Sequence, residues 1–105
     1  MPAPAPHSPP LASSQIRAAR ALLRWSAEDL AIASAVGVAT IRRAELSEHE
    51  TALTAANDLA IRRALEAAGV EFIDGGGGGP GARFRKAGEH NTDSERPRAA
   101  PKQKR

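Results

Sequence analysis

The stretch ASAVGVATIRRAEL, residues 33–46, decides how this chain folds. It opens with a helix-favouring run, meets Gly37 between two β-branched valines, and then resumes a helical pattern that carries two adjacent arginines. Glycine and valine form helix less readily than alanine does. We therefore predict that one helix ends here, that a tight turn falls near residues 35–37, and that a second helix, residues 39–46, starts at once.

The residues before the turn predict how the first of these helices begins. Ser26 and Asp29 have the spacing of a capping box, in which each side chain accepts a hydrogen bond from the other residue's backbone N–H. The acidic residues 28 and 29 also suit the positive end of the helix dipole. We expect Leu30 and Ala31 to face inward. The small side chain of Ala31 then lets the second of these helices cross closely over the first.

Two further helices and a hairpin complete the predicted elements. One helix covers residues 14–24, with Ser13 or Ser14 as N-cap, and the other runs from the N-cap Thr54 to residue 68, where Gly69 ends it. Their expected apolar faces are Ile16, Ala19, Leu22 and Leu23 in the first and Leu59, Ile61, Leu65 and Ala68 in the second. Strands at residues 70–73 and 82–85 around a glycine loop must pack on the helices or pair with another chain, because a lone hairpin is barely stable.

The fold class expected from these patterns is all-α, with four to five short helices, followed by a C-terminal β-hairpin. The helical domain should span residues 13–69 and the hairpin extension residues 70–86. We expect disorder in the proline-rich residues 1–12 and in the basic tail, residues 87–105. Neither end has enough large apolar side chains to offset the entropy that ordering costs.

Composition limits the function classes. The chain has no cysteine, no apolar run that could span a membrane and no signal-peptide pattern, so we expect a cytoplasmic protein without membrane contact. The net charge is +3, yet residues 11–82 hold seven arginines against nine acidic residues. Binding to nucleic acid would therefore depend on a local basic patch and on the tail, because the folded body is not basic overall.

The second helix of the opening stretch offers such a patch. Each helical residue advances by about 100°, so an inward Ile41 places Arg43 about 200° away from it. Ala39, Arg42, Arg43 and Leu46 then face outward. A short turn that presents an arginine-bearing helix is the geometry that inserts a helix into the major groove of DNA. An arginine fork can bind guanine O6 and N7, or a phosphate.

At this point the sequence SAEDLAIASAVGVATIRRAE, residues 26–45, resembles the helix-turn-helix of the Cro/phage-repressor class, the XRE family. The flanks QIRAARALLRWS and ALEAAGVEFIDGGGGGPGARFRK are similar to those of its short bacterial members. The resemblance implies a lambda-repressor-like domain that binds double-stranded DNA and regulates transcription in the bacterial cytoplasm. The DNA-binding residues that we predict are Gly37, Val38, Ala39, Thr40, Arg42, Arg43, Leu46, Arg17 and Arg20. For the last two, on the first helix, plain surface charge is the alternative.

Three residues depart from the family pattern. Ala27 stands in place of a common glutamine that contacts DNA, so that contact is absent. Ala35 stands at the turn glycine, where a left-handed conformation would cost alanine on the order of 1 kcal/mol, unless Gly37 takes up the bend instead. Arg24 replaces a glycine before Trp25, with a similar penalty.

The expected partners are double-stranded DNA and a second copy of the chain. A single module buries little surface, so specific binding usually needs two half-sites, and the hairpin strands offer an edge for a homodimer. The alternative function is an antitoxin-like or other interaction subunit whose main partner is a protein.

We predict no enzymatic activity, no cofactor and no metal site. Gly76, Gly78 and Gly81 match a dinucleotide-binding spacing, but the helix that must follow is missing from the pattern. His7, His49 and His90 lack ligand spacing, and no histidine–carboxylate pair is placed to activate a serine.

Overall fold

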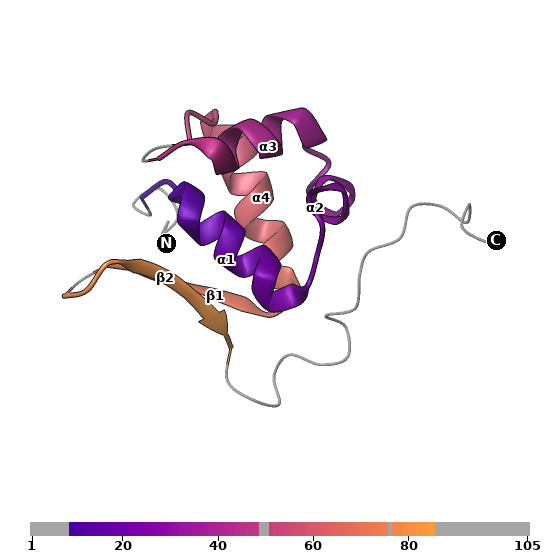
Figure 1. The fold of residues 1–105 in the computed structure, drawn as a ribbon. Coiled ribbons are helices and arrows are strands. Elements are labelled where there is room, and N and C mark those ends of the chain that lie inside the picture. The colour runs from indigo at the N-terminus through magenta and orange to yellow at the C-terminus, as the bar shows by residue number, and fades with distance from the viewer. Residues whose placement is uncertain (1–8, 49–50, 76, 86–105) are drawn as a thin grey trace, which may run out of the picture.

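A computed structural model describes residues 9–48, 51–75 and 77–85 of the chain. These residues form four helices and then a hairpin, which confirms the predicted helix-dominated fold with a C-terminal β-hairpin (Figure 1). The elements are α1 (Ser13–Leu23), α2 (Ala27–Ser34), α3 (Val38–Leu46), α4 (Ala55–Ala67), β1 (Val70–Asp74) and β2 (Pro80–Phe84). Predictions for residues 1–8 and 87–105, and for the three histidines, lie outside the described residues. No described helix combines the length and the apolar character that a bilayer crossing requires.

One hydrophobic core joins the helices to the hairpin. Its fully buried large side chains come from each described helix, from β1 and from the segment before α1: Leu11, Ile16, Leu30, Ile41, Ile61, Leu65 and Val70. Leu11 is only 1% exposed, and its N–H donates to Asp58 Oδ1 at 2.9 Å. The core thus includes a residue that precedes the expected domain start at residue 13. Leu59, which we predicted to be buried on α4, is 36% exposed instead, because Ile61 and Leu65 define the buried face of that helix.

Helix starts follow the predicted N-capping in two of three cases. The Ser26–Asp29 capping box is present, with the N–H of Asp29 donating to Ser26 Oγ at 3.0 Å and the N–H of Ser26 donating to Asp29 Oδ2 at 2.9 Å. Thr54 caps α4 by accepting from the N–H of Asn57. The predicted serine N-cap of α1 is wrong.

Helix α1 begins one residue earlier than a serine cap would require, with Ala12 as its N-cap. Gln15 Oε1 accepts the N–H of Ala12 at 2.9 Å, which satisfies a backbone donor without any capping side chain on residue 12. The Ser13 hydroxyl is used elsewhere, because it donates to the carbonyl of Ser47 at 2.6 Å, just after α3. This serine therefore ties the start of α1 to the end of α3.

The hairpin packs against α1 and α4, on the side of α1 opposite α3 (Figure 1). Its strands pair in antiparallel register from Val70↔Phe84 to Asp74↔Pro80, so they extend closer to the glycine loop than the predicted strands did. Gln15 Nε2 donates to the carbonyls of Ile73 and Gly81, at 3.0 and 3.1 Å. One buried glutamine of α1 thus binds both strands, which meets the expectation that the hairpin needs the helices for support.

Candidate nucleic-acid interface

The turn between α2 and α3 is three residues long, 35–37. Ala35 adopts the left-handed conformation with φ 61°, and its N–H donates to the carbonyl of Ala31 at 2.8 Å. Ser34 Oγ donates to the carbonyl of Leu30 and accepts the N–H of Val36, which satisfies backbone groups of the turn. Gly37 is extended, with φ −60°, so the suggestion that this glycine takes up the bend is wrong. Ala35 itself carries the strain of a left-handed alanine.

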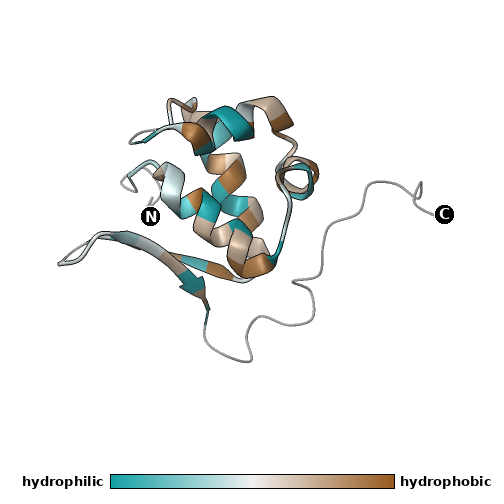
Figure 2. Ribbon diagram, viewed as in Figure 1, coloured by the Kyte–Doolittle hydropathy of each residue, from teal (hydrophilic) through white to brown (hydrophobic). Residues whose placement is uncertain are grey.

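Helix α3 is oriented as predicted. Ile41 is 0% exposed and Ala44 only 1%, whereas Ala39, Arg42, Arg43 and Leu46 are exposed. Polar and apolar segments accordingly alternate along the ribbon of α3 (Figure 2). The other residues predicted at this surface lie at the start of the helix, where Gly37 is exposed and Val38 and Thr40 are half-buried. The structure therefore brings seven of the nine predicted DNA-binding residues onto one element and its cap.

Arg42 forms an ion pair with Glu28, in the first turn of α2. Its Nη2 donates to Glu28 Oε2, and both side chains are more than half exposed, at 55% and 59%. The pKa of Glu28 is lowered, first by a hydrogen bond from its own backbone amide and then by Arg42, with a smaller contribution from the Ser26 hydroxyl. The pair joins the two helices on the outer side of the turn. The sequence analysis treated Glu28 only as a helix-dipole residue and missed this pairing.

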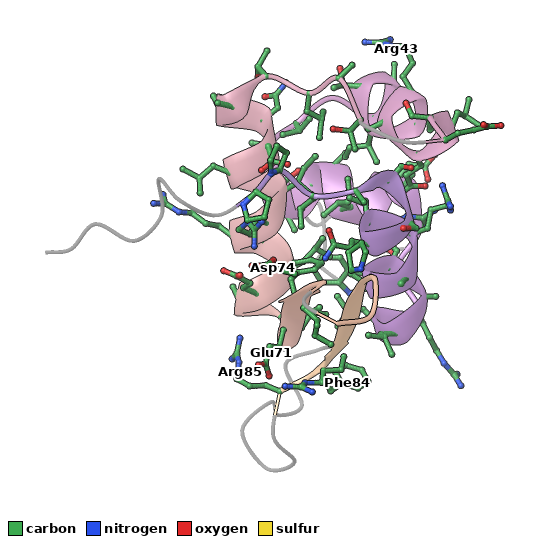
Figure 3. The ribbon with its side chains drawn as sticks, turned by 90° about the vertical axis from the view of Figure 1, so that its left-hand side faces the viewer. Arg43, Glu71, Asp74, Phe84 and Arg85 are labelled. Carbon is green, nitrogen blue, oxygen red and sulfur yellow. The ribbon has the colours of Figure 1, made fainter. Side chains whose placement is uncertain are left out.

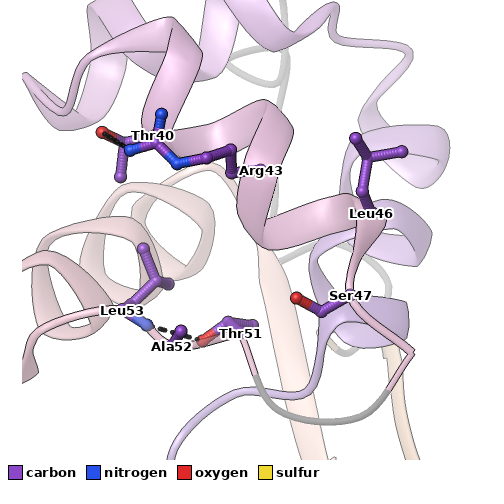
Figure 4. Close-up of a pocket in the computed structure, with 7 residues that line it drawn as sticks. All are labelled: Thr40, Arg43, Leu46, Ser47, Thr51, Ala52 and Leu53. Carbon is purple, nitrogen blue, oxygen red and sulfur yellow. Dashed lines mark hydrogen bonds between the residues drawn. The ribbon is translucent and has the colours of Figure 1, made fainter.

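Arg43 extends along α3 toward Thr40, to whose hydroxyl oxygen its Nη2 donates a long hydrogen bond of 3.4 Å (Figure 4). Beside it lies an open pocket of about 380 Å³ between α3 and the segment that leads into α4. The residues that line this pocket are Thr40, Arg43, Leu46, Ser47, Thr51, Ala52 and Leu53. Leu46 is 81% exposed at the pocket's edge, which places an apolar side chain on the same outer surface as Arg43.

The two predicted arginines of α1 have buried partners instead. Arg20 binds Glu45 with two hydrogen bonds of 2.7 Å, and its Nη1 donates to the carbonyl of Trp25, also at 2.7 Å. Arg17 donates to the backbone carbonyl of Glu45. The side chains of Arg20 and Glu45 are only 23% and 9% exposed. The hydrogen bond to Glu45 is the main cause that raises the pKa of Arg20.

These contacts connect α1 to α3, so the structure gives Arg17 and Arg20 an architectural role within the described residues. Glu45 was missed as their partner, although its position on the inward face of α3 could have been predicted. It lies four residues after the buried Ile41, which places both on the same face of the helix. Arg24, which stands in place of a family glycine, is left-handed with φ 60°, as its position suggested.

Comparison with protein-family models, curated proteins and solved structures gives no match for this chain. Among the described residues, no group of three or more histidine, aspartate or glutamate side chains could hold a metal ion. The site therefore has to be interpreted from its own geometry: a short turn, a helix with a buried isoleucine, and two outward guanidiniums.

Proposed function

We propose that this chain is a sequence-specific DNA-binding transcriptional regulator of the lambda-repressor-like type, with α3 as its recognition helix in the major groove. The observation that supports it best is the exposed face of α3, which carries Ala39, Arg42, Arg43 and Leu46 opposite the buried Ile41. The three-residue turn between α2 and α3 is the short connection that such DNA-binding motifs use to present their second helix.

Three side chains on this face suit the major groove. Among the described residues, Arg43 makes a long hydrogen bond to Thr40 that it would give up on binding DNA, and its fork matches guanine O6 and N7. The neighbouring Leu46 offers the apolar surface that suits a thymine methyl group. The small Ala39 at the start of the helix lets the backbone approach the base edges.

The direct test is the variant Arg43→Ala. A high-affinity duplex is first selected from a random library with the wild-type protein, and binding is then followed by fluorescence anisotropy. We expect the loss of a base contact to cost roughly 1–3 kcal/mol of specific binding. The thermal midpoint should change little, because an exposed arginine contributes little to stability.

The matched control is Arg63→Ala. It removes an exposed arginine from the later part of α4, outside the surface proposed to bind DNA. This variant should bind the selected duplex as the wild type does. A folded Arg43→Ala protein with unchanged affinity, or a wild type that selects no sequence, would contradict the proposed function. If the wild type selects no DNA sequence but retains a protein partner, the result would favour the alternative function as an interaction subunit.

We further propose that the regulator binds as a homodimer. Arg43 and the labelled hairpin residues Glu71, Phe84 and Arg85 lie at opposite ends of the molecule (Figure 3). A dimer formed through the hairpin edge would therefore leave α3 of each copy uncovered. Dimers of this class bind half-sites about 34 Å apart. Sedimentation velocity over a range of protein concentrations tests this, and a monomer bound to a single half-site would contradict it.

A further inference from the structure

Glu28 places a negative charge inside the surface proposed to meet DNA. It lies in the first turn of α2, and its carboxylate binds Arg42 of α3 across the turn. Its side chain is 59% exposed, so this charge is not hidden from a phosphate backbone. A carboxylate at such a place repels a polyanion, and its presence calls for an explanation.

Glu28 also lies in the first turn of α2, at the helix N-terminus, where an anion would otherwise be attracted. Backbone N–H groups and the dipole at a helix N-terminus commonly bind phosphate. In α2, the amide of Asp29 donates to Ser26 Oγ, and the amide of Ser26 donates to Asp29 Oδ2. The protein's own groups thus satisfy amides that could have bound the DNA backbone.

The same contact constrains Arg42. Its Nη2 donates to Glu28, while a guanidinium carries further N–H donors in a fixed planar fork. A hydrogen bond to one nitrogen restricts how the fork can turn, as supporting contacts do in binding sites generally. A restricted fork favours a bidentate acceptor such as a guanine edge over a phosphate, which accepts from many directions.

We propose that Glu28 is a specificity-determining residue, which directs Arg42 toward a base edge and disfavours its use as a phosphate contact. This inference rests on the proposed function. It predicts that Glu28 weakens binding to arbitrary sequence and raises the ratio of specific to non-specific affinity. Glu28 would act through Arg42, as a positioning residue, while Arg42 itself touches the base.

The experiment compares wild type and Glu28→Gln on two duplexes of about thirty base pairs, roughly three turns. One has the sequence that the wild type selects, and the other has a randomised sequence. For Glu28→Gln we expect roughly 3–10-fold tighter binding to the randomised duplex and a salt dependence steeper by about one phosphate contact. Affinity for the selected duplex should rise less, so the specificity ratio falls.

Two sets of variants separate this mechanism from a general charge effect. Glu66→Gln removes a carboxylate with the same change in net charge, from an ion pair with Arg62 on α4. It should leave both affinities unchanged. In the Arg42→Ala variant, Glu28→Gln should tighten binding to the randomised duplex less than it does in the wild type. The reason is that Arg42, the residue that Glu28 positions, is absent.

The outcomes are distinguishable. If the wild type selects a sequence but Glu28→Gln binds the randomised duplex no more tightly, or if Glu66→Gln gives the same gain, this inference is overturned while the proposed function stands. If the wild type binds no duplex, the proposed function fails and this inference fails with it.

Discussion

Two arginine pairs of this molecule look alike in sequence and differ in the structure. Arg17 and Arg20 of α1 meet Glu45, whose side chain is 9% exposed, and they connect two helices. Arg42 and Arg43 of α3 point outward, and the carboxylate that Arg42 meets, Glu28, is 59% exposed. The difference shows that the burial of the partner, rather than the charge of the arginine, separates a structural cation from one available to a ligand.

The ion pair of Arg20 with Glu45 and the ion pair of Arg42 with Glu28 should also differ in energy, because the first is buried and the second is exposed. Removing one partner from a buried ion pair leaves an uncompensated charge and typically costs several kcal/mol, whereas exposed pairs contribute about 0–1 kcal/mol. An arginine whose ion pair is exposed can therefore bind DNA at little cost in stability.

The largest effect is expected for Arg20→Ala. The substitution strands the carboxylate of Glu45 between α1 and α3 and removes the hydrogen bond to the carbonyl of Trp25. We expect a loss of roughly 2–3 kcal/mol in the free energy of unfolding, below the full buried-pair figure because Arg20 is partly exposed. Urea titration followed by circular dichroism measures it. The comparison between the two pairs breaks down if Arg20→Ala and Arg43→Ala are equally stable.

A smaller loss is expected for Arg17→Ala. Arg17 donates to the carbonyl of Glu45, which is one of the last carbonyls of α3 and lacks a helical partner. Losing this hydrogen bond should cost about 1 kcal/mol of stability. Affinity for the selected duplex, measured per folded molecule, should stay within about twofold of the wild type. A large loss of affinity without a loss of stability would instead support the prediction that Arg17 contacts DNA.

Local patterns in the sequence predicted much of this arrangement. The Ser26–Asp29 box, the turn at residues 35–37 and the inward Ile41 depend on neighbours within one or two turns of chain, so they could be inferred without coordinates. The partner of Arg20 could not, because Glu45 is 25 residues away and meets it only after α1 packs on α3. The same limit explains why the helix-dipole role of Glu28 was predicted and its contact with Arg42 was not.

A gain in stability is expected for Ala35→Gly. The left-handed Ala35 ends α2 and sets the direction in which α3 presents Arg42 and Arg43. Glycine adopts this conformation without strain, so the free energy of unfolding should rise by roughly 0.5–1 kcal/mol. The matched control is Ala33→Gly, an exposed position inside α2, where the same substitution should destabilise by up to about 1 kcal/mol. If both variants lowered the free energy of unfolding, Ala35 in the turn would carry no strain.

The smallest effect concerns the pKa of Glu28, which is lowered by its own amide first and by Arg42 second. A lowered pKa in the folded state means that the carboxylate stabilises the fold above its ordinary titration range, and that this contribution disappears as the pH falls through the folded-state pKa. Arg42→Ala should raise the pKa of Glu28, yet leave it below the ordinary value, since the amide and the Ser26 hydroxyl remain. Carboxyl ¹³C chemical shifts followed over an acid titration measure this directly. A Glu28 pKa that does not move in Arg42→Ala would mean that the exposed pair holds neither partner in place, and Arg42 would then reach DNA without guidance from α2.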